Sequence, residues 1–168
     1  MTLESESTPG HSLRDEVRAS DCVAVRDILN ATDFFSAVEM EIAVDLVHER
    51  LEKGPASGYE FLFADQGGET VGYACYGLIP CTAASYDLYW IGVAPGRQGG
   101  GLGQRLLDET EKRVRAAGGT SLYAETSGRS QYAPTRAFYE RCGYAIVSVL
   151  PEFYGPGDDK VVFVKRLE

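Results

Sequence analysis

Four glycines within residues 98–103 are the feature of this sequence that most directly suggests chemistry. They are Gly99, Gly100, Gly101 and Gly103, and Gln98 precedes them. Glycine lets successive backbone N–H groups point the same way and lets a ligand approach the main chain closely. An amphipathic helical pattern begins directly behind the glycines, so the open N–H groups and positive dipole end of a helix should face the same place. The stretch therefore predicts an anion site, with phosphate as the preferred ligand.

Two well-known phosphate-binding patterns do not fit these glycines. A P-loop needs lysine followed by serine or threonine, and no lysine follows the cluster. The dinucleotide fingerprint Gly-x-Gly-x-x-Gly would need glycine at position 104, which is Gln104. The pattern that fits is Gln-x-x-Gly-x-Gly, with Val93 and Pro95 just upstream. A simple flexible turn is the alternative to a phosphate site.

A second motif decides between these alternatives. Residues 135–144 read Thr-Arg-Ala-Phe-Tyr-Glu-Arg-Cys-Gly-Tyr, with the Tyr-Glu pair at Tyr139 and Glu140. The two motifs, in this order and with this spacing of elements, resemble the GNAT superfamily of N-acetyltransferases, whose second segment is written aliphatic-Tyr-Glu-x-x-Gly-Phe. The resemblance covers residues 13–167. It departs at Tyr132, where many members carry an asparagine that bonds the cofactor arm, so that contact is in doubt or replaced.

The resemblance implies acetyl-CoA as co-substrate and no metal. The glycine loop would hold the pyrophosphate, and the pantetheine arm would lie along residues 90–93. Arg97, Arg105 and Arg136 are cations that would meet the phosphates. The implied cofactor-binding residues are Ile91, Val93, Arg97, Gln98, Gly99, Gly100, Gly101, Leu102, Gly103 and Arg136.

Transfer of an acetyl group from a thioester to an amine needs a neutral amine, a donor to the oxyanion and a proton for the departing thiolate. The resemblance places Tyr139 as the general acid, and a phenol is protonated at neutral pH. The Val93 N–H would stabilise the oxyanion. Asp87, six residues before Val93, and Glu125 on the next strand are the two candidates for the general base. Burial would raise the pKa of either carboxyl toward neutral pH.

The acceptor pocket, by the same resemblance, should lie between the early helices and a loop over residues 151–159. The candidate substrate residues are Phe35, Tyr154 and Asp158, with aromatic walls that suit a cation. The leading interpretation is an N-acetyltransferase that acts on a primary amine of a small molecule by direct attack in a ternary complex. The alternatives are an acetyltransferase of a protein N-terminus or lysine, and a non-catalytic CoA-binding regulatory domain.

Hydrophobic periodicity predicts the elements that would position these residues. We expect a strand over residues 13–18, a helix over 21–29 with Asp21 as N-cap, and a helix that begins with a Ser36–Glu39 capping box and ends at Gly54. Strands at 59–65, 70–78 and 86–93 precede the glycine loop and a helix over 102–117. A strand at 121–126, a short helix near Pro134 and strands at 144–150 and 161–165 follow. This order predicts an α/β fold of the GNAT type, with a mixed, mostly antiparallel sheet of six to seven strands and about four helices.

Composition narrows the class of protein. With 168 residues, 44% hydrophobic and 24% charged, the chain fits one acetyltransferase domain over residues 12–168 behind a disordered lead over 1–11. The net charge of −9 argues against nucleic acid as a partner, and the sequence carries no membrane-spanning run. The four cysteines lack metal-ligand spacing and are expected to be buried free thiols. We expect a cytoplasmic enzyme with a small-molecule amine as its partner, and a homodimer as its further association.

Overall fold

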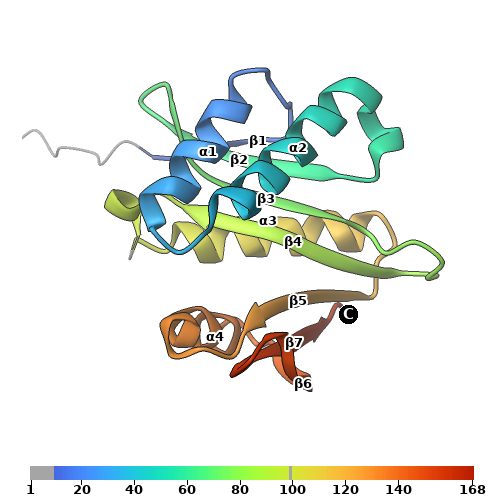
Figure 1. Cartoon of the computed structure of the whole chain (residues 1–168). Coiled ribbons are helices and arrows are strands. Elements are labelled where there is room, and N and C mark those ends of the chain that lie inside the picture. The colour runs from blue at the N-terminus through green and yellow to red at the C-terminus, as the bar shows by residue number, and fades with distance from the viewer. Residues whose placement is uncertain (1–9, 99) are drawn as a thin grey trace, which may run out of the picture. The chain divides into compact units, whose positions relative to one another are not determined.

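The computed structural model of the chain describes residues 10–98 and 100–168. Most of the predicted lead over residues 1–11, and Gly99 of the glycine cluster, lie outside these residues. The helical elements in the described residues are α1 (Asp21–Thr32), α2 (Ala37–Lys53), η1 (Gly54–Ser57), η2 (Pro95–Arg97), α3 (Leu102–Ala116), η3 (Ser130–Tyr132) and α4 (Ala133–Arg141) (Figure 1). The strands are β1 (Ser12–Arg14), β2 (Glu60–Gln66), β3 (Glu69–Leu78), β4 (Ser85–Val93), β5 (Ser121–Ser127), β6 (Ala145–Gly155) and β7 (Asp158–Arg166).

The seven strands are hydrogen-bonded in the order β1-β2-β3-β4-β5-β7-β6. β4 and β5 run parallel and are connected through α3, whereas β1–β2, β5–β7 and β6–β7 are antiparallel. A parallel pair needs such a crossover because its second strand must return to the same end of the sheet. The mixed, mostly antiparallel sheet and its four α-helices confirm the predicted fold class.

Two compact units alternate along the chain. The first contains the residues up to Ala74 together with Ile91–Leu106, and the second contains Cys75–Trp90 and Leu107–Glu168. β3, β4 and α3 therefore each contribute residues to both units. The single domain expected over residues 12–168 stays a prediction. None of the helices in the described residues is long and apolar enough to cross a membrane.

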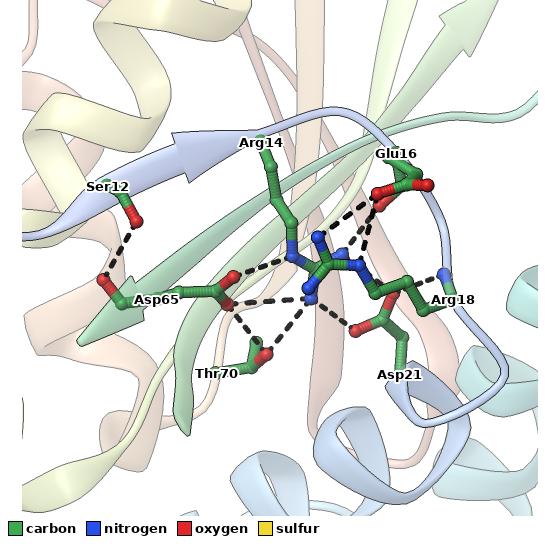
Figure 2. A network of polar contacts seen from close by, with 7 residues as sticks. All are labelled: Ser12, Arg14, Glu16, Arg18, Asp21, Asp65 and Thr70. Carbon is green, nitrogen blue, oxygen red and sulfur yellow. Dashed lines mark hydrogen bonds and ion pairs between the residues drawn. The ribbon is translucent and has the colours of Figure 1, made fainter. Parts of the chain in front are cut away.

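In the first unit, a network around Arg14 fixes β1 to β2 and to the start of α1 (Figure 2). The Arg14 guanidinium donates to Asp65 Oδ2 at 2.7 Å and to Asp21 Oδ2 at 2.9 Å, and it also bonds the Thr70 hydroxyl. Asp21 accepts a further bond from the Arg18 N–H at 2.7 Å and is fully buried. A buried carboxylate of this kind is tolerated because the guanidinium compensates its charge.

The helix starts differ from each other. Ser36 and Glu39 form the predicted capping box at the start of α2, and α2 ends before Gly54 as expected. The prediction of Asp21 as the N-cap of α1 is wrong, because Ser20 is the N-cap and Asp21 is the first helical residue. Its carboxylate is drawn toward Arg14 and the Arg18 N–H instead of capping the helix. β1 also ends at Arg14 rather than at residue 18, and α1 continues to Thr32.

In the second unit, α4 and the second-unit part of α3 pack on one face of the strands. Tyr139 of α4 contacts the ring of Phe163 on β7, with centroids 5.3 Å apart. Lys165, also on β7, donates to both oxygens of the buried Glu111 on α3 at 2.8 and 2.9 Å, and to the Cys142 carbonyl at 2.9 Å. The Tyr144 hydroxyl donates to the same glutamate at 3.1 Å. These bonds hold the C-terminal end of α4 to α3 and β7.

The chain after residue 150 differs from the prediction. A loop was expected over residues 151–159, but β6 continues to Gly155 and β7 starts at Asp158, so the two strands meet in a tight hairpin. The register shifts between Leu150 and Gly155, and Glu152 has a positive φ of 53°. A bulge on the terminal strand accommodates Pro151, which cannot donate to a ladder.

None of the four cysteines, all of which lie in the described residues, forms a disulfide. Cys22, Cys75 and Cys142 are buried as expected, whereas Cys81 is exposed, so the expectation fails for that thiol.

Candidate active site

The end of β4 in the first unit is packed so closely at Gly92 that a side chain there would force its neighbours to move. A Cβ there would lie 3.3 Å from Ile28 Cγ2 on α1 and 3.3 Å from the Tyr73 ring on β3. Gly72 on β3 is equally confined, because its Cβ would lie 3.1 Å from Leu106 Cδ1 on α3. The backbone before Val93 is therefore closely packed against α1 and β3, and Gly72 on β3 is in turn packed against α3.

Val93 presents its own backbone groups away from β3. The N–H of the next residue, Ala94, donates to the Val71 carbonyl on β3 at 2.8 Å. Successive N–H groups of a strand point to opposite edges, so the Val93 N–H and C=O face the edge of β4 away from β3. The Gln98 side-chain amide folds back and donates to the Val93 carbonyl at 3.0 Å. The Val93 N–H faces the same edge of β4 as this carbonyl.

The described part of the glycine loop has an open surface and a backbone that suits glycine. Gly101 has a φ of +77°, a conformation that other residues rarely adopt. No heavy atom lies within 4 Å of a Cβ built at Gly96 or at Gly101, so a ligand could approach the main chain there. The Arg105 N–H donates to the Gly101 carbonyl at 2.9 Å and closes the first turn of α3. The N–H groups of Leu102 and Gly103 belong to the helix start that has no intrahelical acceptor, which is the geometry of an anion site. These residues fit the pyrophosphate of acetyl-CoA.

The three arginines proposed near the phosphates have different partners. Arg97 lies in η2, directly before the loop, and is exposed. Arg105 donates to the His11 carbonyl at 2.9 Å. Arg136 belongs to the second unit, where its Nη1 donates to the carbonyls of Ser127 and Arg129 at 2.7 and 2.9 Å. Arg97 is thus the cation whose position in the chain best matches a phosphate contact.

Asp87 and Glu125, the two candidate bases, lie on the same face of the second unit. Asp87 on β4 is paired with Tyr123 on β5, and Glu125 lies two residues beyond Tyr123, which returns it to the same face. Burial and, to a smaller extent, the negative charge of Glu125 together raise the pKa of Asp87 to about 6, against a lowering by Lys160. Glu125 itself pairs with Lys160 on β7 at 2.7 Å, and its side chain is 44% exposed. The environment of Asp87 therefore suits it for taking up a proton near neutral pH.

Tyr139, the predicted general acid, is almost completely buried in the second unit. Its ring is surrounded by Phe138, Tyr144 and Phe163, at centroid distances of 5.5, 5.6 and 5.3 Å. Burial raises the pKa of the Tyr139 phenol above its usual value, and the thiol of Cys142 contributes in the same direction. The phenol therefore stays protonated throughout the physiological range, as a proton donor must.

The residues expected around the acceptor have separate environments. Phe35 lies between α1 and α2 in the first unit and is partly exposed. Tyr154 lies on β6 and is about half exposed, with its ring edge-on to Phe153 at 5.1 Å. Asp158 is held by the Ser127 hydroxyl and by Arg129, whose Nε lies 3.1 Å from Oδ2. This carboxylate therefore has a structural role at the start of β7, where the sequence had suggested a loop position.

Residues 23–144 match the profile of the Acetyltransferase (GNAT) family. The chain belongs to this family. It is therefore an acyltransferase, as the resemblance of the two motifs implied. GNAT proteins of known structure bind coenzyme A or acetyl-CoA, and two such complexes share this fold at 20% and 22% identity, which shows the fold alone. Among the described residues no group of three or more His, Cys, Asp or Glu side chains is placed to hold a metal ion.

Individual relatives of this GNAT chain agree with the family. A crystal structure of a Desulfovibrio desulfuricans protein ascribed to the GNAT acetyltransferases has 46% identity and a TM-score of 0.93, covering 95% of this chain and 100% of that one. The mycothiol acetyltransferase of Beutenbergia cavernae is 38% identical over 73 residues, which is 42% of this chain but only 23% of that protein's length. The L-amino acid N-acyltransferase MnaT of Escherichia coli is 24% identical over 144 residues, 80% of each chain.

One side chain of the site and one contact were not predicted from the sequence. Lys160, which pairs with Glu125, falls between the loop expected over residues 151–159 and the strand expected from residue 161, and no role was predicted for it. Continuing the strand pattern backwards from Val162 in steps of two would have placed it on the same face as Glu125. The contact of the Gln98 amide with the Val93 carbonyl had no sequence signal beyond the position of the glutamine in the motif.

Proposed function

We propose that this GNAT chain transfers the acetyl group of acetyl-CoA to the primary amine of a small molecule by direct attack in a ternary complex. The observation that carries the proposal is Asp87, a half-buried carboxyl on β4 whose pKa is raised to about 6. Such a group is ionised at pH 7 yet basic enough to accept a proton, which acetylation of an ammonium requires and simple binding of CoA does not. Its presence favours an enzyme over a non-catalytic CoA-binding domain.

Each chemical requirement has a residue in this proposal. The loop around Gly101 and the start of α3 bind the pyrophosphate, and Arg97 supplies a positive charge beside it. Bound acetyl-CoA supplies the activated acetyl group. The Val93 N–H stabilises the oxyanion, Asp87 takes the proton of the attacking amine through water, and Tyr139 protonates the departing thiolate.

The charge around Asp87 and the name of one relative support a small amine as the acceptor. The face of the second unit that carries Asp87 and Glu125 has a net negative charge even after pairing with Lys160, which suits an ammonium group. The relative MnaT is named for acylation of L-amino acids, which are small amines. Acetylation of a protein N-terminus or lysine is the second candidate, since the exposed rings of Phe153 and Tyr154 on β6 offer apolar contacts to a peptide.

A homodimer is part of the same proposal. β6 is the terminal strand of the sheet and exposes large apolar side chains, while Glu152 is its only charged residue. Two copies of a chain with net charge −9 repel each other least where they meet through a surface with few charges, such as this strand. Sedimentation velocity across a range of protein concentrations tests it, and a monomer at every concentration would contradict it.

The direct test of the activity is an acetyl-transfer assay. The protein is incubated with acetyl-CoA and with amino acids, diamines, aminoglycosides and N-terminal peptides, and release of free thiol is followed. We expect turnover with a small amine above the rate of hydrolysis without acceptor. Tight CoA binding without turnover of any acceptor would favour the non-catalytic domain, and turnover of peptides alone would favour the protein acetyltransferase.

A further inference from the structure

Three charged side chains from different strands lie on one face of the second unit. Asp87 comes from β4, Glu125 from β5 and Lys160 from β7. The register sets Glu125 opposite Val162 and Ser127 opposite Lys160, so Lys160 lies one step of two residues from the partner of Glu125 and shares its face. The ordered strands thus bring together a base candidate, a second carboxylate and one ammonium group.

Glu125 forms an ion pair with Lys160. Lys160 Nζ lies 2.7 Å from Glu125 Oε2 and also 4.4 Å from the centroid of the Phe153 ring. The Lys160 side chain is only 16% exposed, whereas that of Glu125 is 44% exposed. A lysine held between a carboxylate and an aromatic ring has little freedom, so its charge stays at a fixed place beside Glu125.

We infer that Glu125 and Lys160 are a charge pair that sets how readily Asp87 takes up a proton, and that neither transfers a proton itself. The inference rests on the proposed function, in which Asp87 is the base. In that step an N–H bond of the acceptor ammonium breaks and an O–H bond forms on Asp87, through water, leaving a neutral amine and a neutral carboxyl group. The negative charge of Glu125 favours protonation of Asp87, because protonation removes the repulsion between the two carboxylates. The positive charge of Lys160 opposes protonation. The two residues act as positioning residues through Asp87.

Among the described residues, Glu125 and Lys160 are the two charges that act on the pKa of Asp87. β3, the other neighbour of β4, has no acidic or basic residue between Thr70 and Leu78. The phenols of Tyr89 and Tyr123 share the face by alternation, and tyrosine is uncharged near neutral pH. On β7, Asp158 is held by Ser127 and Arg129, and Arg166 bonds the Ser121 hydroxyl at the far end of β5; these are the remaining charged residues of the strand on that face.

The pair predicts opposite effects of two substitutions. Glu125→Gln removes the negative charge and leaves Lys160, so the pKa of Asp87 should fall by about half a unit, the scale of one charge several ångströms away near a surface. Lys160→Met keeps the aliphatic stem over Phe153 but leaves Glu125 uncompensated, so the pKa of Asp87 should rise by a similar amount. The acid limb of kcat/KM should move with it. At pH 5.5 the rate should rise about twofold in Glu125→Gln and fall about two- to threefold in Lys160→Met. The double variant should return close to the original limb.

A matched pair on α3 controls for net charge. Glu109 and Lys112 form an ion pair at 3.6 Å on the exposed surface of that helix. Glu109→Gln and Lys112→Met change the protein charge by the same amounts. They should leave the acid limb in place, because neither residue is among the charges that shift the pKa of Asp87, and salt screens charges at the surface.

Two readouts separate this inference from the proposed function. The first is the carboxyl ¹³C chemical shift of Asp87 titrated in each variant, assigned with Asp87→Asn, and the second is the pH dependence of kcat/KM. Opposite shifts in both readouts support the inference. An Asp87 titration that does not move in opposite directions in Glu125→Gln and Lys160→Met overturns it, whatever the activity. A titration that moves while the acid limb of kcat/KM stays in place leaves the pair in control of Asp87 and overturns the assignment of Asp87 as the base.

Discussion

Replacing Lys165 by methionine should destabilise the protein more than any other single lysine change in the described residues. Lys165 Nζ donates to Glu111 Oε1 at 2.9 Å, to Glu111 Oε2 at 2.8 Å and to the Cys142 carbonyl at 2.9 Å. The Glu111 side chain is 4% exposed, so water cannot replace these donors. The substitution would leave a buried carboxylate and the carbonyl at the end of α4 without their main partner.

The size of the effect follows from the partners that remain. Removing one member of a buried ion pair costs about 3–5 kcal/mol. Glu111 keeps the Tyr144 hydroxyl at 3.1 Å and the Arg115 guanidinium at 3.6 Å, and methionine retains the aliphatic packing of the lysine stem. We therefore expect a loss at the lower end, about 3 kcal/mol in the free energy of unfolding.

Urea unfolding at pH 7, followed by circular dichroism, measures this loss from the change in midpoint at constant m-value. Lys112→Met is the matched control. That lysine is 71% exposed, and its 3.6 Å ion pair with Glu109 is accessible to solvent. It should change stability by less than about 0.5 kcal/mol. Glu111→Gln added to Lys165→Met should recover about 2 kcal/mol, because the buried amide no longer needs a counter-charge.

A loss below about 1 kcal/mol for Lys165→Met, or no recovery in the double variant, would refute the reasoning. Either result would mean that Glu111 does not carry a buried charge that depends on Lys165. Since Lys165 also donates to the Cys142 carbonyl, the same variant should loosen the end of α4. Faster amide exchange near Cys142 would show this loosening.

Three further predictions concern the site. Tyr139→Phe should lower kcat by about 10²-fold or more while CoA affinity stays within about twofold, and an unchanged kcat would remove the phenol from the mechanism. Gly101→Glu should abolish CoA binding in calorimetry, because a charged side chain would enter an anion site at a φ of +77°; Gly67→Glu, in the β2–β3 turn at a φ of +60°, carries similar strain but should bind CoA normally. Asp87→Asn should lose acetyl transfer yet unfold about 1 kcal/mol less readily at pH 7, after discounting for the half-exposed carboxyl. A folded-state pKa raised to about 6 makes ionisation of Asp87 costly, so this gain should be present above pH 6 and disappear below about pH 4; an equal gain at pH 3 would contradict the cause.

Local patterns in the sequence were enough to predict most elements and the family. The capping box of Ser36 and Glu39 and the glycines after α2 have effects confined to neighbouring residues, so they could be identified without the fold. The glycine loop and the Tyr139 motif are likewise contiguous, and their order along the chain indicated an acetyltransferase. The terminal hairpin was not predicted, because the bulge near Glu152 depends on pairing with β7. The proline and glycine residues of this stretch favoured a loop instead.

What the sequence by itself determined was the identity of the chemical groups: glycine backbone at the anion site, a phenol, and two candidate carboxylates for the base, of which Asp87 was favoured over Glu125. Only the tertiary structure gave the surroundings of these carboxylates, because the proton affinity of a carboxyl group depends on its burial and on charges from distant parts of the chain. Parallel pairing of β4 with β5 brings Glu125 to the face of Asp87, and β7 adds Lys160 from 35 positions further along the chain than Glu125. The same kind of long-range contact drew Asp21 from the predicted cap into a buried pair with Arg14. Electrostatic partners that are remote in sequence leave no local pattern, whereas glycine conformation, capping and helical periodicity do.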